Sequence, residues 1–348
     1  MINTDSIRQQ LATVKYPGFS RDIVSFGLVK DIRITGSEVV VQMSMSTADA
    51  TVPQQIKANA EAALAAMEGV TSAVVRIDIT APQQQPMGAQ SMPQTSIPGV
   101  KYVIAVASGK GGVGKSTVAA NLACALAATG ASVGLCDCDL YGPSVGIMFG
   151  ANERPFADED NRIIPIERYG LKLMSMGFLL EDDAPAILRG PMVTKYTQQF
   201  LRQVKWDGTD FLVLDLPPGT GDIQLTIVQT VALTGAIIVT TPQEVALLDA
   251  RKAVAMFQKV NVPVLGIIEN MAYFQCPSDG VRYDIFGSGG GEREAVRQKV
   301  PLLGQIPIDI ATRESGDRGK PITAAEPESA VALAFAEIAK ALRKSLGA

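Results

Sequence analysis

The chain has 348 residues, of which 47% are hydrophobic and 19% are charged, and its formal net charge is −4. This composition is typical of a soluble globular protein with a large core, and it argues against a disordered tail or a nucleic-acid binder that works by bulk positive charge. The absence of histidine excludes His metal ligands and Ser-His-Asp or Cys-His catalysis, while the presence of only four cysteines favours a reducing compartment and predicts a cytoplasmic protein.

We expect no signal peptide at the beginning of this sequence, because Asp5 stands where such a peptide is basic and no apolar run follows. Two long stretches without charge, residues 116–136 and 223–243, are interrupted by Gly130 and Gly235. We interpret each stretch as a buried helix that leads into a buried strand, and we predict no membrane association.

Residues 1–80 predict a small α+β domain. Its expected elements are a helix over Thr4–Val14, strands over Val24–Ile34 and Val39–Met45, a helix over Val52–Met67 and a strand over Ser72–Ile79. Thr4 or Asp5 is the expected cap of the first helix. Residues 81–99 carry no charge and no apolar period, so they predict a flexible Pro/Gln-rich linker between two domains.

Residues 100–348 alternate strand-like with helix-like runs, which predicts an α/β domain with a doubly wound, mostly parallel sheet. The expected strands are Tyr102–Ala107, Val133–Asp137, Leu171–Met176, Phe211–Leu216, Ala236–Thr240, Val264–Asn270 and Leu302–Ile306. The expected crossover helices include Val193–Val204, Ile223–Leu233, Glu244–Val260 and Ala330–Leu346.

The segment Ser108–Thr117 follows the first of these strands, opens a helix and matches the pattern G-x-x-x-x-G-K-S/T. Glycines in this loop let backbone N–H groups surround a phosphate, Lys115 offsets the charge of the β- and γ-phosphates, and Ser116 is placed to bind Mg²⁺. We therefore predict an ATP site. Its loop residues are Gly109, Lys110, Gly111, Gly112, Val113, Gly114, Lys115, Ser116 and Thr117.

Acidic residues follow two of the predicted strands. Asp215 ends an apolar strand and resembles a Walker B aspartate that holds Mg²⁺ through water. For Asp137 and Asp139 we expect one carboxylate near the magnesium shell and one that orients the attacking water, because no histidine is available; a pair that caps the next helix is the alternative. Gly219 is expected to donate its N–H to the γ-phosphate.

Lys110 is a second lysine that the ordinary loop does not require. This variant resembles the deviant Walker A loop of the MinD and nitrogenase-iron-protein class of dimeric ATPases. The resemblance implies that Lys110 reaches across a dimer to the partner's nucleotide and adds positive charge in the transition state. A solvated loop lysine is the alternative.

Several segments together resemble the Mrp/ApbC family of iron–sulfur cluster carriers, which have a P-loop ATPase fold. They are Gly109–Thr117, Asp137–Ser144, Arg189–Met192, Asp215–Asp222, Glu269–Met271, Phe286–Gly291 and Arg313–Asp317. The resemblance covers nearly all of residues 100–345, with Pro217–Asp222 as its most specific part. Asp22–Val29 resembles the small iron–sulfur assembly domain often fused in front of this ATPase.

The resemblance implies a homodimer with ATP near its interface and a slow hydrolysis of ATP to ADP and phosphate. It also implies a bridging 4Fe-4S cluster, held by a C-x-x-C from each subunit and transferred to apo-proteins, with cluster assembly scaffolds as further partners. Asn270 and the turn of Pro307, Ile308 and Asp309 occupy positions that resemble the family's adenine contacts. For Asn270, a turn residue at a strand end is the alternative.

The sequence departs from the family pattern at the expected cluster site, where Cys276 is followed by Asp279 in place of a second cysteine. A dimer then offers two thiolates, although four is the usual number for such a cluster. Three alternatives stay open. Asp279 is an unusual ligand, a small thiol or the recipient protein completes a labile cluster, or Cys276 is an incidental loop cysteine. Cys124 and Cys136 are expected in the core, and the side chain of Cys138 is expected to point away from the neighbouring acids.

Two other functions compete with a carrier. One is a MinD- or ParA-like switch in which ATP drives dimerisation on a membrane or DNA, and the other is a non-catalytic nucleotide-binding scaffold. The acidic balance disfavours DNA. The amphipathic run Val331–Leu346 has an apolar face of mostly Ala and Leu, which predicts packing onto the sheet and not insertion into lipid.

Overall fold

The computed structural model describes residues 3–15, 22–24, 28–46, 51–67, 69–80, 96–139, 141–179 and 201–348. Contacts between residues divide the chain into two compact units, residues 1–90 and 91–348. Most of the predicted linker, residues 81–95, lies outside the described residues, as do the segment Arg189–Met192 and the greater part of the predicted helix Val193–Val204.

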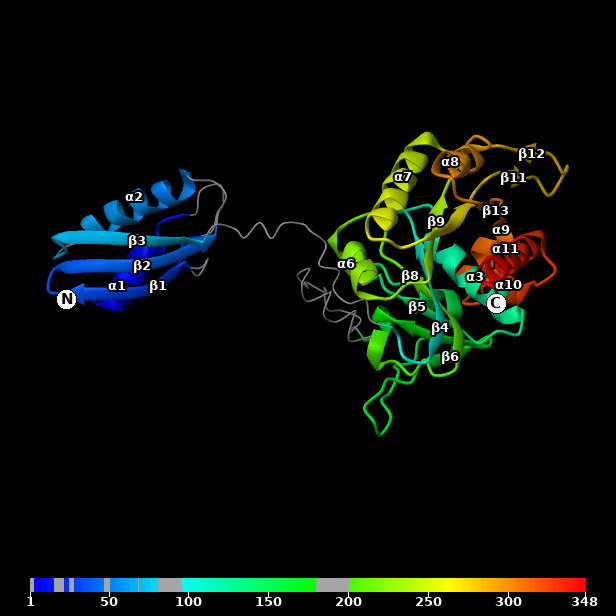
Figure 1. Ribbon diagram of the computed structural model, residues 1–348, viewed down its shortest axis with the longest axis horizontal. Helices are drawn as coiled ribbons and strands as arrows, with labels where there is room; N and C mark the ends of the chain where they lie inside the picture. Colours follow the sequence, from blue (N-terminus) through cyan, green and yellow to red (C-terminus); the bar gives the residue numbers. More distant parts are fainter. Residues whose placement is uncertain are drawn as a thin grey trace. The chain divides into compact units, whose positions relative to one another are not determined.

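The first unit packs two helices against a three-stranded sheet (Figure 1). Its elements are α1 (Thr4–Leu11), β1 (Val29–Thr35), β2 (Glu38–Ser46), α2 (Thr51–Ala65) and β3 (Ser72–Thr80). β1 and β2 are antiparallel, whereas β2 and β3 are parallel because α2 connects them as a crossover. The core joins Ile7 and Leu11 of α1, Ile56 and Leu64 of α2, and the inward side chains of β2.

The predicted cap of α1 is wrong. Asn3 is the N-cap: its backbone is extended and its side chain accepts the N–H of Ser6 at 2.8 Å, while the Ser6 hydroxyl lies 3.1 Å from the N–H of Asn3. Thr4 and Asp5 fall in the first turn, where Asp5 still interacts favourably with the helix dipole. The strand predicted from Val24 begins only at Val29, since Ile23 and Val24 lie in a turn.

The second unit contains an eight-stranded sheet in the order β13-β10-β9-β4-β8-β5-β7-β6. The strands are β4 (Val100–Ala107), β5 (Val133–Asp137), β6 (Ile166–Arg168), β7 (Leu171–Ser175), β8 (Thr209–Asp215), β9 (Gly235–Thr240), β10 (Val264–Glu269) and β13 (Leu302–Gln305). All neighbours are parallel except β6 and β7. The loops after β4, β5, β8 and β10 therefore emerge at the same edge of the sheet.

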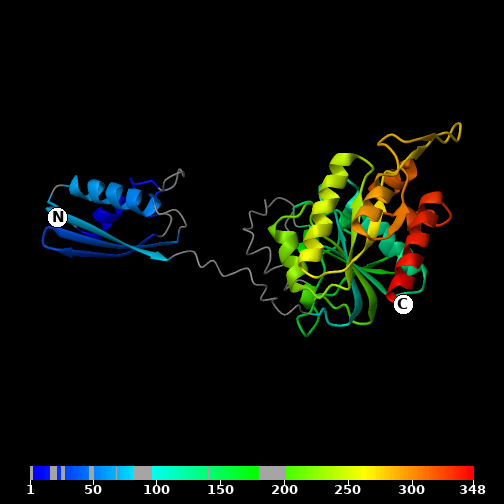
Figure 2. The same ribbon diagram turned by 45° about the horizontal axis from the view of Figure 1, so that its top comes forward.

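Helices cover both faces of this sheet, which confirms the predicted doubly wound α/β fold (Figures 1 and 2). The helices are α3 (Lys115–Ala128), α4 (Val145–Phe149), α6 (Asp222–Thr230), α7 (Glu244–Lys259), α8 (Gly290–Gln298), α9 (Ile310–Asp317), α10 (Ile322–Ala325) and α11 (Ala330–Leu346). α3 and α11 pack on one face of the sheet, and α6 and α7 pack on the other. Because both faces are covered, β5 and β9 are buried along their whole length.

α11 has the predicted bounds and packs as predicted. Val331, Phe335, Ile338 and Leu342 form one buried stripe against the core that includes α3. The short antiparallel strand β6 and the hairpin of β11 (Phe274–Gln275) and β12 (Arg282–Tyr283) were not predicted, because runs of two or three residues carry no period.

Within the described part of the chain, every helix is too short or too polar to cross a membrane.

Candidate functional site

The predicted phosphate loop lies between β4 and α3 at the centre of the sheet edge, and all nine predicted loop residues belong to it or to the first turn of α3. Two of its glycines are required by close neighbours. A β-carbon on Gly109 would lie 2.0 Å from the carbonyl oxygen of Asp249 in α7, and one on Gly114 would lie 2.2 Å from Nδ2 of Asn270. Gly114 also has a φ of 77°, which favours glycine. The loop therefore packs closely against both α7 and the end of β10.

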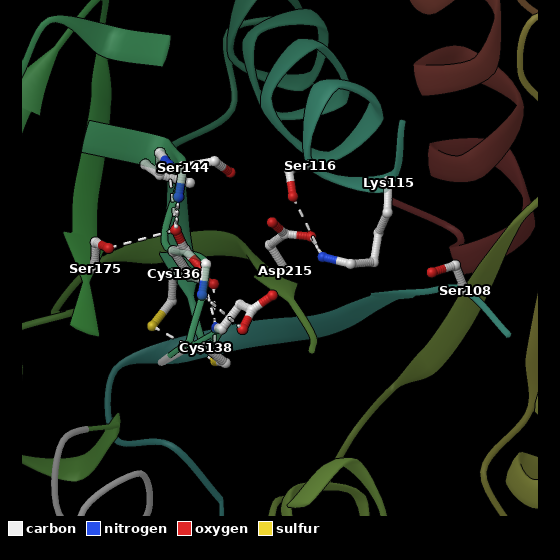
Figure 3. A network of polar contacts seen from close by, with 12 residues as sticks. Ser108, Lys115, Ser116, Cys136, Cys138, Ser144, Ser175 and Asp215 are labelled. Atoms are coloured by element: carbon white, nitrogen blue, oxygen red, sulfur yellow. Dashed lines mark hydrogen bonds and ion pairs between the residues drawn. The ribbon is translucent and has the colours of Figure 1, made fainter. Parts of the chain in front are cut away.

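A buried ion pair joins the loop to the end of β8. The ammonium of Lys115, whose side chain is 6% exposed, contacts Oδ1 of the fully buried Asp215 and lies 3.3 Å from the Ser116 hydroxyl (Figure 3). Burial raises the pKa of Asp215 even though Lys115 opposes that shift. The second carboxylate oxygen, Oδ2, is buried and has no hydrogen-bond partner in the described part of the chain. An unpaired carboxylate oxygen near a serine hydroxyl suits the water shell of Mg²⁺, so these residues fit the predicted ion.

Asp137 lies at the end of β5, next to β8, and is fully buried. Its Oδ2 accepts the N–H groups of Ser144 at 2.8 Å and Val145 at 3.1 Å, while its Oδ1 accepts that of Asp139 at 3.0 Å. Burial and the Asp215 charge nevertheless raise the pKa of Asp137 to about 6. Asp137 therefore holds the start of α4, as the capping alternative foresaw, and stands beside the Lys115–Asp215 pair.

Asp139 is half-buried and lies further out on the same loop. Its Oδ1 accepts the N–H groups of Tyr141 and Gly142 at 3.1 and 3.2 Å. Among the described residues, its Oδ2 accepts no hydrogen bond from a donor, so one oxygen remains able to bind water.

Gly219, for which we predict a bond to the γ-phosphate, lies in the loop after β8. Its N–H donates to the carbonyl of Ser108 at 3.0 Å. The bond fastens the loop after β8 to the start of the phosphate loop. A positive φ of 91° turns the backbone at Gly219.

Lys110 is half-buried, and its side chain forms no ion pair with any residue that the structure describes. Its carbonyl accepts the Ser108 hydroxyl at 2.8 Å. The side chain is thus free to reach a second molecule.

The predicted adenine residues line one cavity of about 520 Å³ that opens beside Gly114 and Thr117. Nδ2 of Asn270 donates to the carbonyl of Val113 at 2.8 Å, so the amide is fixed and its Oδ1 remains an acceptor. Pro307 and Asp309 lie on the facing loop, where Asp309 also caps α9 by accepting the N–H of Thr312 at 2.7 Å. The cavity has a size and lining suited to a nucleoside.

Met271, Phe286 and Arg313 are among the cavity residues that the sequence did not predict as site residues. All three lie in segments that carry the family resemblance, which was the signal that marked them.

Cys276 lies on the hairpin of β11 and β12, which projects from the second unit (Figures 1 and 2). Its Sγ is 3.0 Å from the Ser278 hydroxyl, and its N–H donates to the carbonyl of Val281 at 2.9 Å. The N–H of Val281 and the thiol of Cys276 hold the pKa of Asp279 below its usual range. The turn therefore brings one thiol and one ionised carboxylate together, and the described residues contain no group of three or more metal-binding side chains.

The other three cysteines are buried, as predicted for Cys124 and Cys136. Burial raises the pKa of Cys124 to about 12. The sulfur atoms of Cys136 and Cys138 lie 3.9 Å apart in the core and point away from the Lys115–Asp215 pair (Figure 3).

Comparison with known families and proteins gives consistent matches. The family model described as "NUBPL iron-transfer P-loop NTPase" matches residues 99–343, and that of an "iron-sulfur cluster assembly protein" matches residues 4–85. An "iron-sulfur cluster carrier protein" of Synechocystis is 45% identical over 346 residues, which cover 98% of this chain and 97% of the relative. A protein of the same description from Aquifex aeolicus is 57% identical over 261 residues, covering 74% and 71%.

Solved structures show the same fold. A nucleotide-binding protein of Archaeoglobus fulgidus in complex with ADP is 40% identical, with a TM-score of 0.59 over 66% of this chain and 90% of that one. The cell division ATPase MinD of Pyrococcus furiosus is 25% identical, with a TM-score of 0.55 over 70% and 99%.

Proposed function

Because this chain belongs to the NUBPL family of iron-transfer P-loop NTPases, we propose that it binds and hydrolyses ATP and carries an iron–sulfur cluster to apo-proteins. One observation carries the proposal. The segment that follows β10 lines the nucleotide cavity with Asn270 and Met271, forms the hairpin with Cys276, and returns to the cavity at Phe286. The nucleotide site and the only cysteine that is not buried therefore share one stretch of chain.

ATP would lie with its base between Asn270 and Pro307 and its phosphates in the loop of residues 109–116. The free acceptor of Asn270 matches the amino group of adenine, and guanine offers a carbonyl oxygen there instead. Ser116 and Asp215 would hold Mg²⁺, which neutralises phosphate charge when bound. Lys115 supplies a fixed positive charge, and Asp139 has an oxygen available to orient water.

The iron–sulfur cluster is the cargo in this proposal. A single chain offers one soft thiolate, Cys276, with the ionised Asp279 beside it. Two copies would double that set to two thiolates and two carboxylates, so we place the cluster between two copies of the hairpin. Fewer than four thiolates would leave the cluster weakly held, which suits a protein that must release it.

The ATP site is tested by comparing Lys115→Ala with Lys110→Ala. Loss of Lys115 removes a charged contact to phosphate, so nucleotide affinity should fall by about 100-fold. Loss of Lys110 should leave affinity within about threefold of wild type and lower the rate of hydrolysis, since this lysine would act on the partner's nucleotide. Titration calorimetry with ATP and a phosphate-release assay separate the two effects. Unchanged hydrolysis in Lys115→Ala would refute the assignment and favour a site elsewhere.

The cargo is tested by anaerobic reconstitution with iron and sulfide, followed by measurement of iron per dimer and of the absorption spectrum. The wild type should take up cluster, Cys276→Ala should not, and the buried-cysteine control Cys124→Ala should behave like the wild type. Asp279→Cys should hold the cluster more tightly, because it adds a thiolate from each copy. A wild type that takes up no cluster, or a Cys276→Ala variant that takes up as much as wild type, contradicts the carrier function.

The likeness to MinD keeps an ATP-dependent dimerisation switch as the alternative. The buried stripe of α11 argues against membrane binding through that helix. Co-sedimentation with liposomes, with and without ATP, decides between the two: clear ATP-dependent binding would favour the switch.

A further inference from the structure

A second cavity, of about 640 Å³, lies beside the phosphate loop and holds a polar group without a partner. It is bounded by Asp139 and Tyr141 after β5, Pro217 and Pro218 after β8, and Gln224 in the first turn of α6. The loop that contains Pro217 and Pro218 is fastened to the phosphate loop by the bond from Gly219 to Ser108. The cavity is therefore next to the place where the terminal phosphate of ATP would lie.

Gln224 is 1% exposed, and neither its Oε1 nor its Nε2 has a hydrogen-bond partner among the residues that the structure describes. An unpaired buried amide is costly, and native proteins rarely keep one without a reason. The usual structural role of a glutamine at this position would be to cap the helix. Gln224 is the third residue of α6, from which a glutamine can reach back to the N-cap, but it forms no such bond to Gly221. The carboxamide is thus not used by the fold.

Asp139 presents the complementary group in the same cavity wall. Its Oδ1 is fixed by two backbone N–H groups, and its Oδ2 accepts no hydrogen bond from any described donor. A water needs two to four polar partners, and the cavity far exceeds the roughly 30 Å³ that one water takes up in the liquid. The two polar atoms of Gln224 are shielded in the conformation described, so the side chain must turn into the cavity to reach a water. A carboxylate and a carboxamide can then accept from and donate to one water, and some P-loop hydrolases use a glutamine to orient the attacking water.

We propose that Gln224 positions the hydrolytic water together with Asp139; this inference rests on the ATP hydrolysis proposed above. The water oxygen forms a bond to the γ-phosphorus while the bond from that phosphorus to the β–γ bridging oxygen breaks, and its electron pair leaves with ADP. The proton lost by the water ends on the released phosphate. Gln224 holds the water in line by its amide and neither gains nor loses a proton.

Gln224→Leu tests the inference, because leucine keeps the volume and removes both polar atoms. Single-turnover ATP hydrolysis should slow by about 100-fold, while the Kd for ATP stays within about twofold. Thermal stability should be equal or higher, because the variant no longer buries an unpaired amide. Gln229→Leu, the same change at an exposed position of the same helix, should hydrolyse ATP at the wild-type rate.

The opposite movement of rate and stability separates a positioning role from a structural one. Gln224→Met provides a second, unbranched replacement in case leucine prevents folding. Wild-type hydrolysis in both variants overturns the inference, as does a fall in rate accompanied by a fall in melting temperature. If the wild type itself shows no hydrolysis that depends on Lys115, the proposed function fails and this inference fails with it; if only the Gln224 variants keep their rate, the proposed function stands.

Discussion

At the scale of single residues, the pKa values of the two acids in the site depend on how deeply each carboxyl group is buried and on which charges lie next to it. Asp137 accepts three N–H hydrogen bonds, all of which favour its charged form, yet burial and the Asp215 charge outweigh them. The pKa of Asp215 is also raised, although its carboxylate contacts the ammonium of a lysine. Two neighbouring buried carboxyl groups with a single lysine, which contacts Asp215, leave the site short of positive charge, which a bound cation would supply.

The raised pKa of Asp137 predicts a specific pH dependence. The shift runs from 3.8 to about 6, so the carboxyl group stabilises the fold fully below pH 4 and this contribution disappears as the pH rises through 6. Relative to Asp137→Asn, the wild type should lose on the order of 3 kcal/mol of unfolding free energy between about pH 4 and pH 6. Urea denaturation across this range measures the difference.

Asp158→Asn is the control for that experiment. The N–H of Arg162 and the ammonium of Lys205 lower the pKa of Asp158, so its stabilising contribution is present above its unfolded pKa and is lost as the pH falls. Between pH 4 and pH 6 the Asp158→Asn difference should therefore stay nearly constant while the Asp137→Asn difference changes, and the contribution of Asp158 should fall only at lower pH. A difference for Asp137→Asn that is constant from pH 4 to pH 6 would show that its pKa is not raised.

At the scale of elements, the phosphate loop depends on how closely α7 and β10 approach it. Gly109 touches the backbone of α7, and the amide of Asn270 at the end of β10 holds the Val113 carbonyl. The loop geometry is therefore built by three elements that are far apart in sequence. A separate hydrogen bond connects the cavity to the hairpin that carries Cys276, since Ile308 donates its N–H to the carbonyl of Tyr273 at 2.7 Å.

Gly109→Ala should break this arrangement. The added carbon would overlap the Asp249 carbonyl, and backbone cannot rotate away as a flexible side chain can. We expect a loss of about 1–3 kcal/mol in unfolding free energy and a weaker affinity for ATP. Gly111→Ala is the matched control: its carbon would meet only Pro218 at 3.9 Å, so stability should change by less than about 1 kcal/mol. Equal stability of the two variants in urea would show that α7 does not support the loop.

At the scale of the whole molecule, the chain has separate cores. Among the described residues, the core of the first unit is formed by residues before 80, and the two cores of the second unit are formed by residues after 96. None of the residues proposed to bind ATP belongs to the first unit. The first unit also contains no cysteine, so any part it plays in cluster transfer would be recognition of partners and not ligation.

Each unit should therefore fold without the other. A fragment of residues 96–348 should bind ATP with a Kd within about twofold of the full chain, because its cores and its cavity are complete. A fragment of residues 1–80 should unfold cooperatively, with a stability near the low end of the usual 5–15 kcal/mol. Calorimetry of both fragments checks this. Loss of ATP affinity in the larger fragment would show that the first unit contributes to the nucleotide site.

The sequence by itself determined the parallel sheet, the phosphate loop and the packing of α11, because these follow from local patterns: apolar runs, a motif in register with a strand and a helix, and a helical stripe. It located the Asn270 cavity and Cys276 only through resemblance to a family. The tertiary structure decided what depends on distant neighbours. It brought the Gly219 N–H to the Ser108 carbonyl and the Asp137 carboxylate to the backbone at the start of α4. It also buried Asp137, which shifts the pKa of that residue, and left the amide of Gln224 without a hydrogen-bond partner in the cavity wall that contains Asp139. Burial and hydrogen-bond pairing arise only when separate elements meet, so no local pattern could have predicted them.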